Sequence, residues 1–147
     1  KNVDLYRTVK RQFRLTSNKL DYVAQTLGLG AKTQHKGMQL WTGCMDGNEK
    51  DWRVMERYNK QDVKLLEKVY KRLLPWIKNH PNMGLYGKGD RPACHTCGSH
   101  KLQKRGLAYT KTMTYQRYQC TSCGSWSRER TNNVPKEKKA NILTEVV

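Results

Sequence analysis

The chain has 147 residues, 36% of them hydrophobic and only one of them Phe, so it can form one ordinary domain or two small ones with a modest core. Lys and Arg total 29 against 12 acidic residues, and the formal net charge of +17 favours a polyanionic partner. We find no signal peptide and no apolar run near the length of a membrane span, so we expect no membrane partner and an intracellular location, cytoplasmic or, for a viral protein, in the host cytoplasm.

The first 78 residues are predicted to be helical. Apolar side chains at helical spacing indicate an amphipathic helix over 3–13. A second apolar stripe over 20–27 follows the N-capping side chains of residues 16–18 and stops at the glycines of 28–30. Next come a polar loop over 31–37, a short helix over 38–45, a break at 46–48 and a helix that begins over 49–58.

The clearest helical pattern begins at Asp62. Its apolar stripe consists of Val63, Leu66, Val69, Tyr70, Leu73, Leu74 and Ile77. Pro75 lacks a backbone N–H and should kink or end this helix. Nothing before residue 90 is predicted to be a strand, so the helices either pack on each other or face a sheet that this chain does not contain.

Four cysteines form two knuckles, Cys94-x2-Cys97 and Cys120-x2-Cys123, and each knuckle is followed by Gly. Such turns deliver two thiolates each, and four thiolates complete a closed tetrahedral Zn²⁺ site, which is structural rather than catalytic. Two disulfides or a redox dithiol are the alternative interpretation. The sequence therefore favours a zinc ribbon.

Other candidate metal ligands are left out of this site. Cys44 is far from the knuckles and is expected to be a small, half-buried apolar residue. His95 and His100 flank the first knuckle, but four thiolates already complete the shell.

After residue 78 the sequence pattern changes from helical periodicity to short alternating segments. Residues 79–91 are rich in Gly and are predicted to be a linker. Alternating segments over 101–109, 112–120 and 125–130 predict the three strands of a ribbon spanning 92–131. The tail, 132–147, has little to bury and is expected to be flexible.

Tyr58 and Asp62 lie four positions apart, so on a helix both side chains leave one face, one turn apart. A carboxylate suits Mg²⁺ or Mn²⁺, and a phenol can orient the water that attacks a phosphodiester. An ordinary pair on a helix surface is the alternative, and the pattern by itself favours it.

The order of three segments resembles a known family. Asp4-Leu5-Tyr6, the stretch 17–30 and the stretch 56–63 resemble the last half of RNase H-like 3′–5′ exonucleases, in the branch related to the proofreading domain of family B DNA polymerases. The third motif of that branch is Tyr-x3-Asp. The resemblance covers about residues 3–78 and implies that Asp62 is a ligand of Mg²⁺ or Mn²⁺ and that Tyr58 orients water.

The family also needs an Asp-x-Glu pair, and none occurs in this sequence. We therefore expect the chain to correspond to the C-terminal half of such an exonuclease, completed by a missing N-terminal half or by a partner chain that covers the helices, or to be a remnant kept for binding. The implied fold class is α+β, with the helical part of an RNase H-like domain over 1–78, followed by a three-stranded zinc ribbon.

The ribbon is rich in side chains that suit nucleic acid. Basic groups can neutralise phosphates, and Tyr109, Tyr115, Tyr118 or Trp126 could stack on unpaired bases, with a place in the ribbon's small core as the alternative. The candidates are Lys101, Lys104, Arg105, Lys111, Arg117, Arg128, Arg130 and Tyr115.

Three functions remain open at this point. The first is a metal-dependent 3′–5′ exonuclease whose zinc ribbon grips nucleic acid, with DNA favoured over RNA. The second is a non-catalytic nucleic-acid-binding protein derived from a nuclease. The third, a ribbon that binds proteins as in transcription machinery, leaves the basic charge unexplained.

Overall fold

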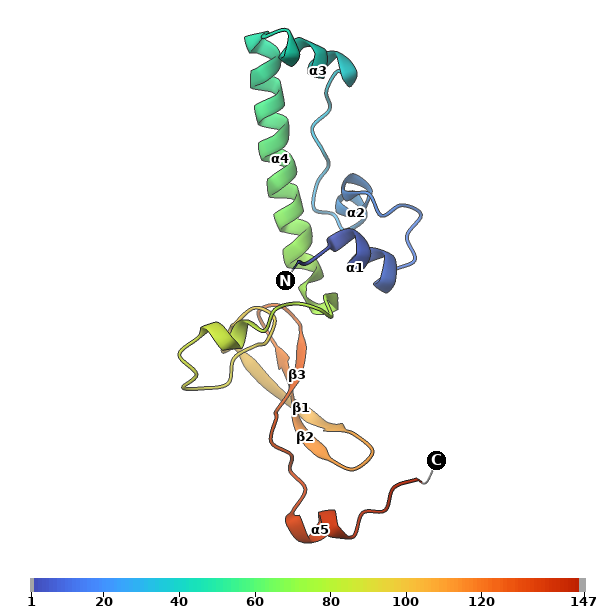
Figure 1. Cartoon of the computed structure of the whole chain (residues 1–147), viewed down its shortest axis with the longest axis vertical. Coiled ribbons are helices and arrows are strands. Elements are labelled where there is room, and N and C mark those ends of the chain that lie inside the picture. Colours follow the sequence, from blue (N-terminus) through green and yellow to red (C-terminus); the bar gives the residue numbers. More distant parts are fainter. Residues whose placement is uncertain (1, 146–147) are drawn as a thin grey trace. The chain divides into compact units, whose positions relative to one another are not determined.

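The computed structural model describes residues 2–145, and its backbone contacts divide the chain into two compact units. The first unit is Asn2–Leu73 and the second begins at Leu74. Helices fill the first unit, and a three-stranded antiparallel sheet forms the centre of the second (Figure 1). This combination agrees with the predicted α+β class. The predicted division at 78, 91 and 131 stays a prediction, and Lys1, Val146 and Val147 at its ends lie outside the described residues.

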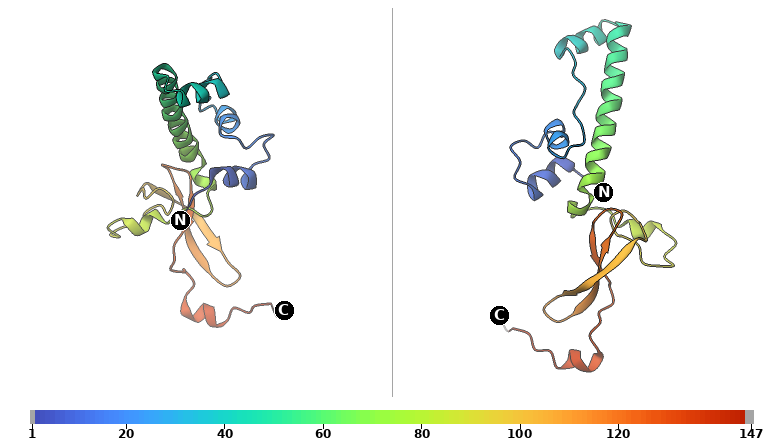
Figure 2. Two further views of the ribbon diagram at one scale, coloured as in Figure 1. Left: turned by 45° about the horizontal axis from the view of Figure 1, so that its top comes forward. Right: turned by 180° about the vertical axis from the view of Figure 1, so that it is seen from behind.

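The first unit contains α1 (Leu5–Gln12), α2 (Leu20–Thr26), α3 (Met38–Met45) and α4 (Glu49–Leu73). α1 begins after Asp4, whose Oδ1 accepts a hydrogen bond from the backbone N–H of Arg7 at 3.0 Å. The chain between α2 and α3 runs alongside α4 (Figure 1 and Figure 2).

The start of α2 differs from the prediction. Its N-cap is Lys19, which makes no side-chain capping bond. Ser17 accepts a hydrogen bond from the N–H of Lys19 instead, so the polar side chains of 16–18 shape the preceding turn rather than cap the helix. The end of α2 agrees with the prediction, because Gly28 (φ 67°) takes up a left-handed conformation that favours Gly.

α4 is a single helix of 25 residues, so the predicted helical segments over 49–58 and from residue 62 are continuous. It ends at Leu73, and Leu74–Trp76 form a 3-10 turn at Pro75 as predicted. The predicted stripe is partly wrong, because Val63 and Leu66 are 68% and 45% exposed. Leu65, which the stripe omitted, is fully buried.

The main core of the first unit joins α4 to α1 and α2. Its buried members are Val9, Val23, Ala24, Leu65, Val69 and Leu73. A smaller cluster of Leu40, Cys44 and Met55 joins α3 to α4. Cys44 is thus a buried apolar residue, and burial raises the pKa of its thiol.

The second unit contains β1 (Leu102–Tyr109), β2 (Thr114–Cys120) and β3 (Trp126–Arg128), which pair in the order β1-β2-β3. These strands lie within the three predicted segments. β1 carries a bulge between Lys104 and Leu107, where Gly106 has φ 71°. The alternation of side chains and the two knuckles therefore predicted this sheet correctly.

The segments on either side of the sheet contain short helical elements. A 3-10 turn, η2 (Met83–Tyr86), lies against the first knuckle, and the N–H of Met83 donates to the carbonyl of His95 at 2.7 Å. After the sheet comes α5 (Lys136–Ala140), which buries none of its residues. Among the described residues, no helix is both long and apolar enough to cross a membrane.

Candidate functional site

Tyr58 and Asp62 converge on the ammonium group of Lys32. Lys32 Nζ donates to Asp62 Oδ2 at 2.6 Å and to the Tyr58 hydroxyl oxygen at 3.2 Å. α4 supplies the phenol and the carboxylate from successive turns, and the loop between α2 and α3 supplies the lysine. The predicted juxtaposition of Tyr58 and Asp62 on one helix face is therefore present, and both oxygens reach one cationic group.

Asp21 holds the loop in this position. Its Oδ1 accepts a hydrogen bond from the backbone N–H of Lys32 at 2.7 Å, and its Oδ2 accepts one from Gln25 at 2.7 Å. The bond from the Lys32 N–H is the main reason that the pKa of Asp21 lies below its ordinary value. His35, from the same loop, packs edge-on against the Tyr58 ring at 4.6 Å between centroids.

The ion pair has an electrostatic consequence for Lys32. The hydrogen bond to Asp62 raises the pKa of the Lys32 ammonium, although its partial burial acts in the opposite direction. The side chains of Lys32 and Asp62 are 31% and 21% exposed, so the pair is only partly screened by solvent.

Asp62 also has an oxygen that no protein group uses. Its Oδ1 is buried and has no hydrogen-bond partner among the described residues. A carboxylate oxygen of this kind suits a hard divalent cation such as Mg²⁺ or Mn²⁺. Within residues 2–145, however, no cluster of three carboxylate or His ligands forms around it. The described residues therefore fit one ligand of such an ion rather than a complete shell.

The four knuckle cysteines form a compact cluster in the second unit. Their sulfurs all lie within 4.8 Å of one another, and Cys94–Cys123 and Cys97–Cys120 are the pairs at 3.6 Å. All four are free thiols, which excludes the disulfide alternative in this structure. Sulfurs about 3.8 Å apart are what a tetrahedral Zn–S shell requires, so the cluster can hold a metal ion such as zinc.

The hydrogen bonding of the cluster favours thiolate at one position. Burial raises the pKa of Cys97, as it does that of Cys94. Burial acts the same way on Cys120, but hydrogen bonds from the backbone of Cys123 and Ser122 and from the thiols of Cys97 and Cys123 together outweigh it and bring its pKa to about 7. Metal binding to such a cluster would displace the remaining thiol protons.

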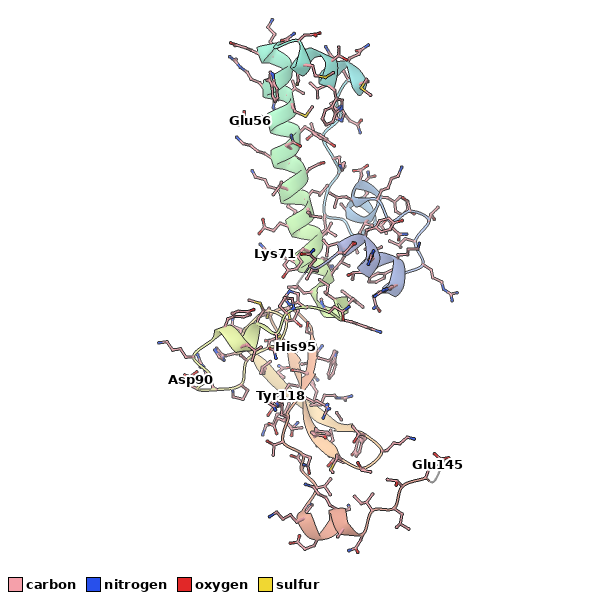
Figure 3. The ribbon with its side chains drawn as sticks, in the orientation of Figure 1. Glu56, Lys71, Asp90, His95, Tyr118 and Glu145 are labelled. Carbon is pink, nitrogen blue, oxygen red and sulfur yellow. The ribbon has the colours of Figure 1, made fainter. Side chains whose placement is uncertain are left out.

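The structure separates the predicted nucleic-acid-binding residues into groups. Arg105, Tyr115, Arg117 and Arg128 share one face of the sheet by alternation and register, and Lys104 lies on the other face. Lys101, Lys111 and Arg130 lie in the connections before, between and after the strands. On the face of Lys104, the hydroxyl of Tyr118 (labelled in Figure 3) donates to Glu129 at 2.5 Å.

A family model for the RNase H superfamily matches residues 1–74, which is half of the 147-residue chain. The chain belongs to the RNase H superfamily. The matched region contains Lys32, Tyr58 and Asp62, whereas the cysteine cluster lies outside it. No curated protein and no solved structure matches the chain.

Sequence reasoning missed Asp21, Lys32 and His35 as members of the site of this RNase H-like unit. Lys32 lies 30 positions from Asp62 and 26 from Tyr58, in a loop with no periodicity. No local signal distinguishes it from the other lysines of this basic chain, so its place at the site depends on the fold.

Proposed function

We propose that the chain supplies part of the active site of a metal-dependent 3′–5′ exonuclease and that its second unit, a zinc ribbon, grips the nucleic acid. The observation that carries this proposal is the meeting of the Tyr58 hydroxyl and the Asp62 carboxylate at one cationic group, with Asp62 Oδ1 still free. Membership of the RNase H superfamily supports a nuclease-related function, and the Tyr-x3-Asp spacing favours the exonuclease branch.

In this proposal Asp62 is one ligand of Mg²⁺ or Mn²⁺, and Tyr58 orients the attacking water through its hydroxyl. A bound divalent ion would supply Lewis-acid activation of the phosphodiester. The remaining carboxylates come from an Asp-x-Glu segment or a partner chain, because the described residues offer one carboxylate at this site.

In this proposal the ribbon binds the nucleic acid and takes no part in the hydrolysis. Zinc at Cys94, Cys97, Cys120 and Cys123 would be structural, because four protein ligands leave no position for water. The basic side chains of the sheet and its connections would neutralise phosphates, with DNA as the favoured partner.

A non-catalytic nucleic-acid-binding protein is the second candidate. The Lys32–Asp62 ion pair favours it, because the ammonium group already neutralises the carboxylate that a metal needs. The deciding experiment supplies the missing carboxylate segment and looks for Mg²⁺- or Mn²⁺-dependent shortening from 3′ ends that Asp62→Ala abolishes. The absence of cleavage by the completed protein would leave the binding function.

A further inference from the structure

Two arginines lie directly opposite each other on one face of the sheet. The register pairs Arg117 of β2 with Arg128 of β3, so both side chains leave the same face. Like charges at such directly opposed positions destabilise a sheet. Within residues 2–145 neither guanidinium forms an ion pair with a carboxylate. An anion placed between the two groups would relieve this repulsion.

Each guanidinium is held in place by an aromatic ring. Arg117 Cζ lies 4.8 Å from the centroid of the Trp126 ring, and Arg128 Cζ lies 3.8 Å from that of Tyr115. Stacking of this kind occupies the flat side of the guanidinium and leaves its N–H edge for an acceptor. Each guanidinium therefore has an aromatic partner before any ligand binds.

The bulge in β1 fixes Arg117 further. Gly106 at φ 71° breaks the ladder there, and the freed carbonyl of Arg105 accepts a hydrogen bond from Arg117 Nε at 2.9 Å. The neighbouring Gly106 carbonyl accepts from the Gln116 side chain at 3.0 Å. The remaining N–H groups of Arg117 are left for a ligand.

The two guanidinium groups lie over rings on opposite diagonals of the β2–β3 pair, Arg117 over Trp126 and Arg128 over Tyr115. Because neighbouring strands lie only about 4.8 Å apart, the two groups can donate to neighbouring phosphates of one bound strand. Trp126 flanks the pair on the same face and is 48% exposed. A ring exposed beside a phosphate site can stack on an unpaired base, whereas the bases of a duplex are already stacked inside it.

We propose that Arg117 and Arg128 bind neighbouring phosphodiesters of a single-stranded nucleic acid and that an adjacent unpaired base stacks on Trp126. This inference deepens the proposed function, because it rests on nucleic acid being the partner and names the single strand as the form that the ribbon binds. Both DNA and RNA share the chemistry that the pair recognises.

The test is fluorescence anisotropy of the whole chain with a fluorescein-labelled oligothymidylate, without added Mg²⁺ or Mn²⁺. The double variant Arg117→Gln/Arg128→Gln should bind roughly tenfold or more weakly and should lower the salt slope by about 0.7 for each phosphate that the variant no longer neutralises. The control, Lys136→Gln/Lys138→Gln, removes the same charge from exposed residues of α5 and should bind nearly as the unaltered chain does. Equal losses of affinity in the two double variants would overturn the site.

Two further variants separate geometry and stacking from charge. Arg117→Lys/Arg128→Lys keeps the charge, loses the forked donors and should bind more weakly than the unaltered chain; equal binding would contradict the arginine geometry.

Trp126→Ala should weaken binding of oligothymidylate but not of a duplex of the same length. Trp41→Ala is the matched control, because Trp41 is also 48% exposed and lies in the first unit. If Trp126→Ala weakened both probes equally, the single-strand assignment would be wrong.

The variants must keep the zinc content of the unaltered chain, which shows that the ribbon is folded. Because no divalent ion is added, binding is measured independently of cleavage. A failure of Asp62-dependent cleavage with arginine-dependent binding intact would contradict only the exonuclease proposal. Unchanged binding in the arginine double variant would contradict only the phosphate site.

Discussion

Lys32 Nζ lies 2.6 Å from Asp62 Oδ2, and this ion pair ties the loop after α2 to the middle of the long helix α4. The first residues of this loop, Leu27 and Leu29, pack against the main core of the first unit. Polar contacts then hold the loop at Lys32: the ion pair, the bond from Lys32 Nζ to Tyr58 and the bond from the Lys32 N–H to Asp21.

Replacing this lysine should destabilise the first unit. Lys32→Met leaves the partly buried Asp62 carboxylate without its charged donor, and we expect a loss of about 1–2 kcal/mol in the free energy of unfolding at pH 7. Urea unfolding followed by circular dichroism measures it. Lys36→Met, an exposed lysine of the same loop, is the control and should change stability little. Equal effects of the two variants would show that the ion pair adds nothing.

The same pair predicts a dependence on alkaline pH. Its hydrogen bond to Asp62 raises the pKa of Lys32 above the ordinary 10.5, so the pair stabilises the folded state fully below that pH. The contribution is lost as pH rises through the folded pKa. The stability difference between the unaltered chain and Lys32→Met should therefore shrink at strongly alkaline pH, and a difference that grows there would contradict this interpretation.

The face that α4 buries can be tested by two truncations. Leu65→Ala removes a fully buried side chain and should cost about 2–4 kcal/mol of unfolding free energy. Val63→Ala changes a side chain that is 68% exposed and should cost less than about 0.5 kcal/mol. Urea titration of both variants measures the two unfolding free energies and shows which face of α4 is buried. A larger cost at Val63 would mean that α4 buries the face predicted from the sequence.

The cysteine cluster should hold one zinc ion per chain. Metal analysis of protein purified without added zinc should find about one equivalent, because four sulfurs within 4.8 Å offer a complete shell. A chelator should unfold the ribbon, because Cys94 and Cys120 are the buried apolar residues described within 92–131, while the helices of the first unit remain. Amide NMR spectra with and without chelator would show this. Recovery of disulfides, or of protein without zinc, would contradict the assignment.

Nucleic-acid binding should depend steeply on salt. With a net charge of +17, the chain should lose affinity by roughly a factor of ten or more between about 50 and 200 mM salt if several phosphates are contacted. Anisotropy titrations at a series of salt concentrations measure the slope. A shallow slope, or equal binding to heparin and to every nucleic-acid form, would count against a dedicated binding surface.

The sequence predicted the elements with local signals. The helix Met38–Met45 has the bounds expected from its apolar residues and the break that follows it. The strands lie within the predicted segments, because the side-chain alternation and the knuckle turns are local features. The buried face of α4 was predicted less well, since Val63, Leu65 and Leu66 are all apolar and the choice among them depends on where α1 and α2 pack.

The candidate site, too, was predictable from the sequence only in its local part. A spacing of four on a helix is enough to bring Tyr58 and Asp62 together. Lys32 comes from a loop 30 positions away that Asp21 holds in place, so its contact with Asp62 follows only from the fold. The stacking of Arg117 on Trp126 likewise requires the register of β2 and β3.

The most direct measurement is the shortening of a 5′-labelled strand by the chain supplied with the missing carboxylate segment, in Mg²⁺ or Mn²⁺. Asp62→Ala should abolish shortening from the 3′ end, because a metal ligand is lost, and Tyr58→Phe should slow it less, because only the hydroxyl is removed. Glu56→Ala, which removes another lysine-paired carboxylate of α4 (Figure 3), should leave the rate unchanged. The chain without that segment should bind but not cleave. Full activity of the Asp62→Ala protein would contradict the assigned site.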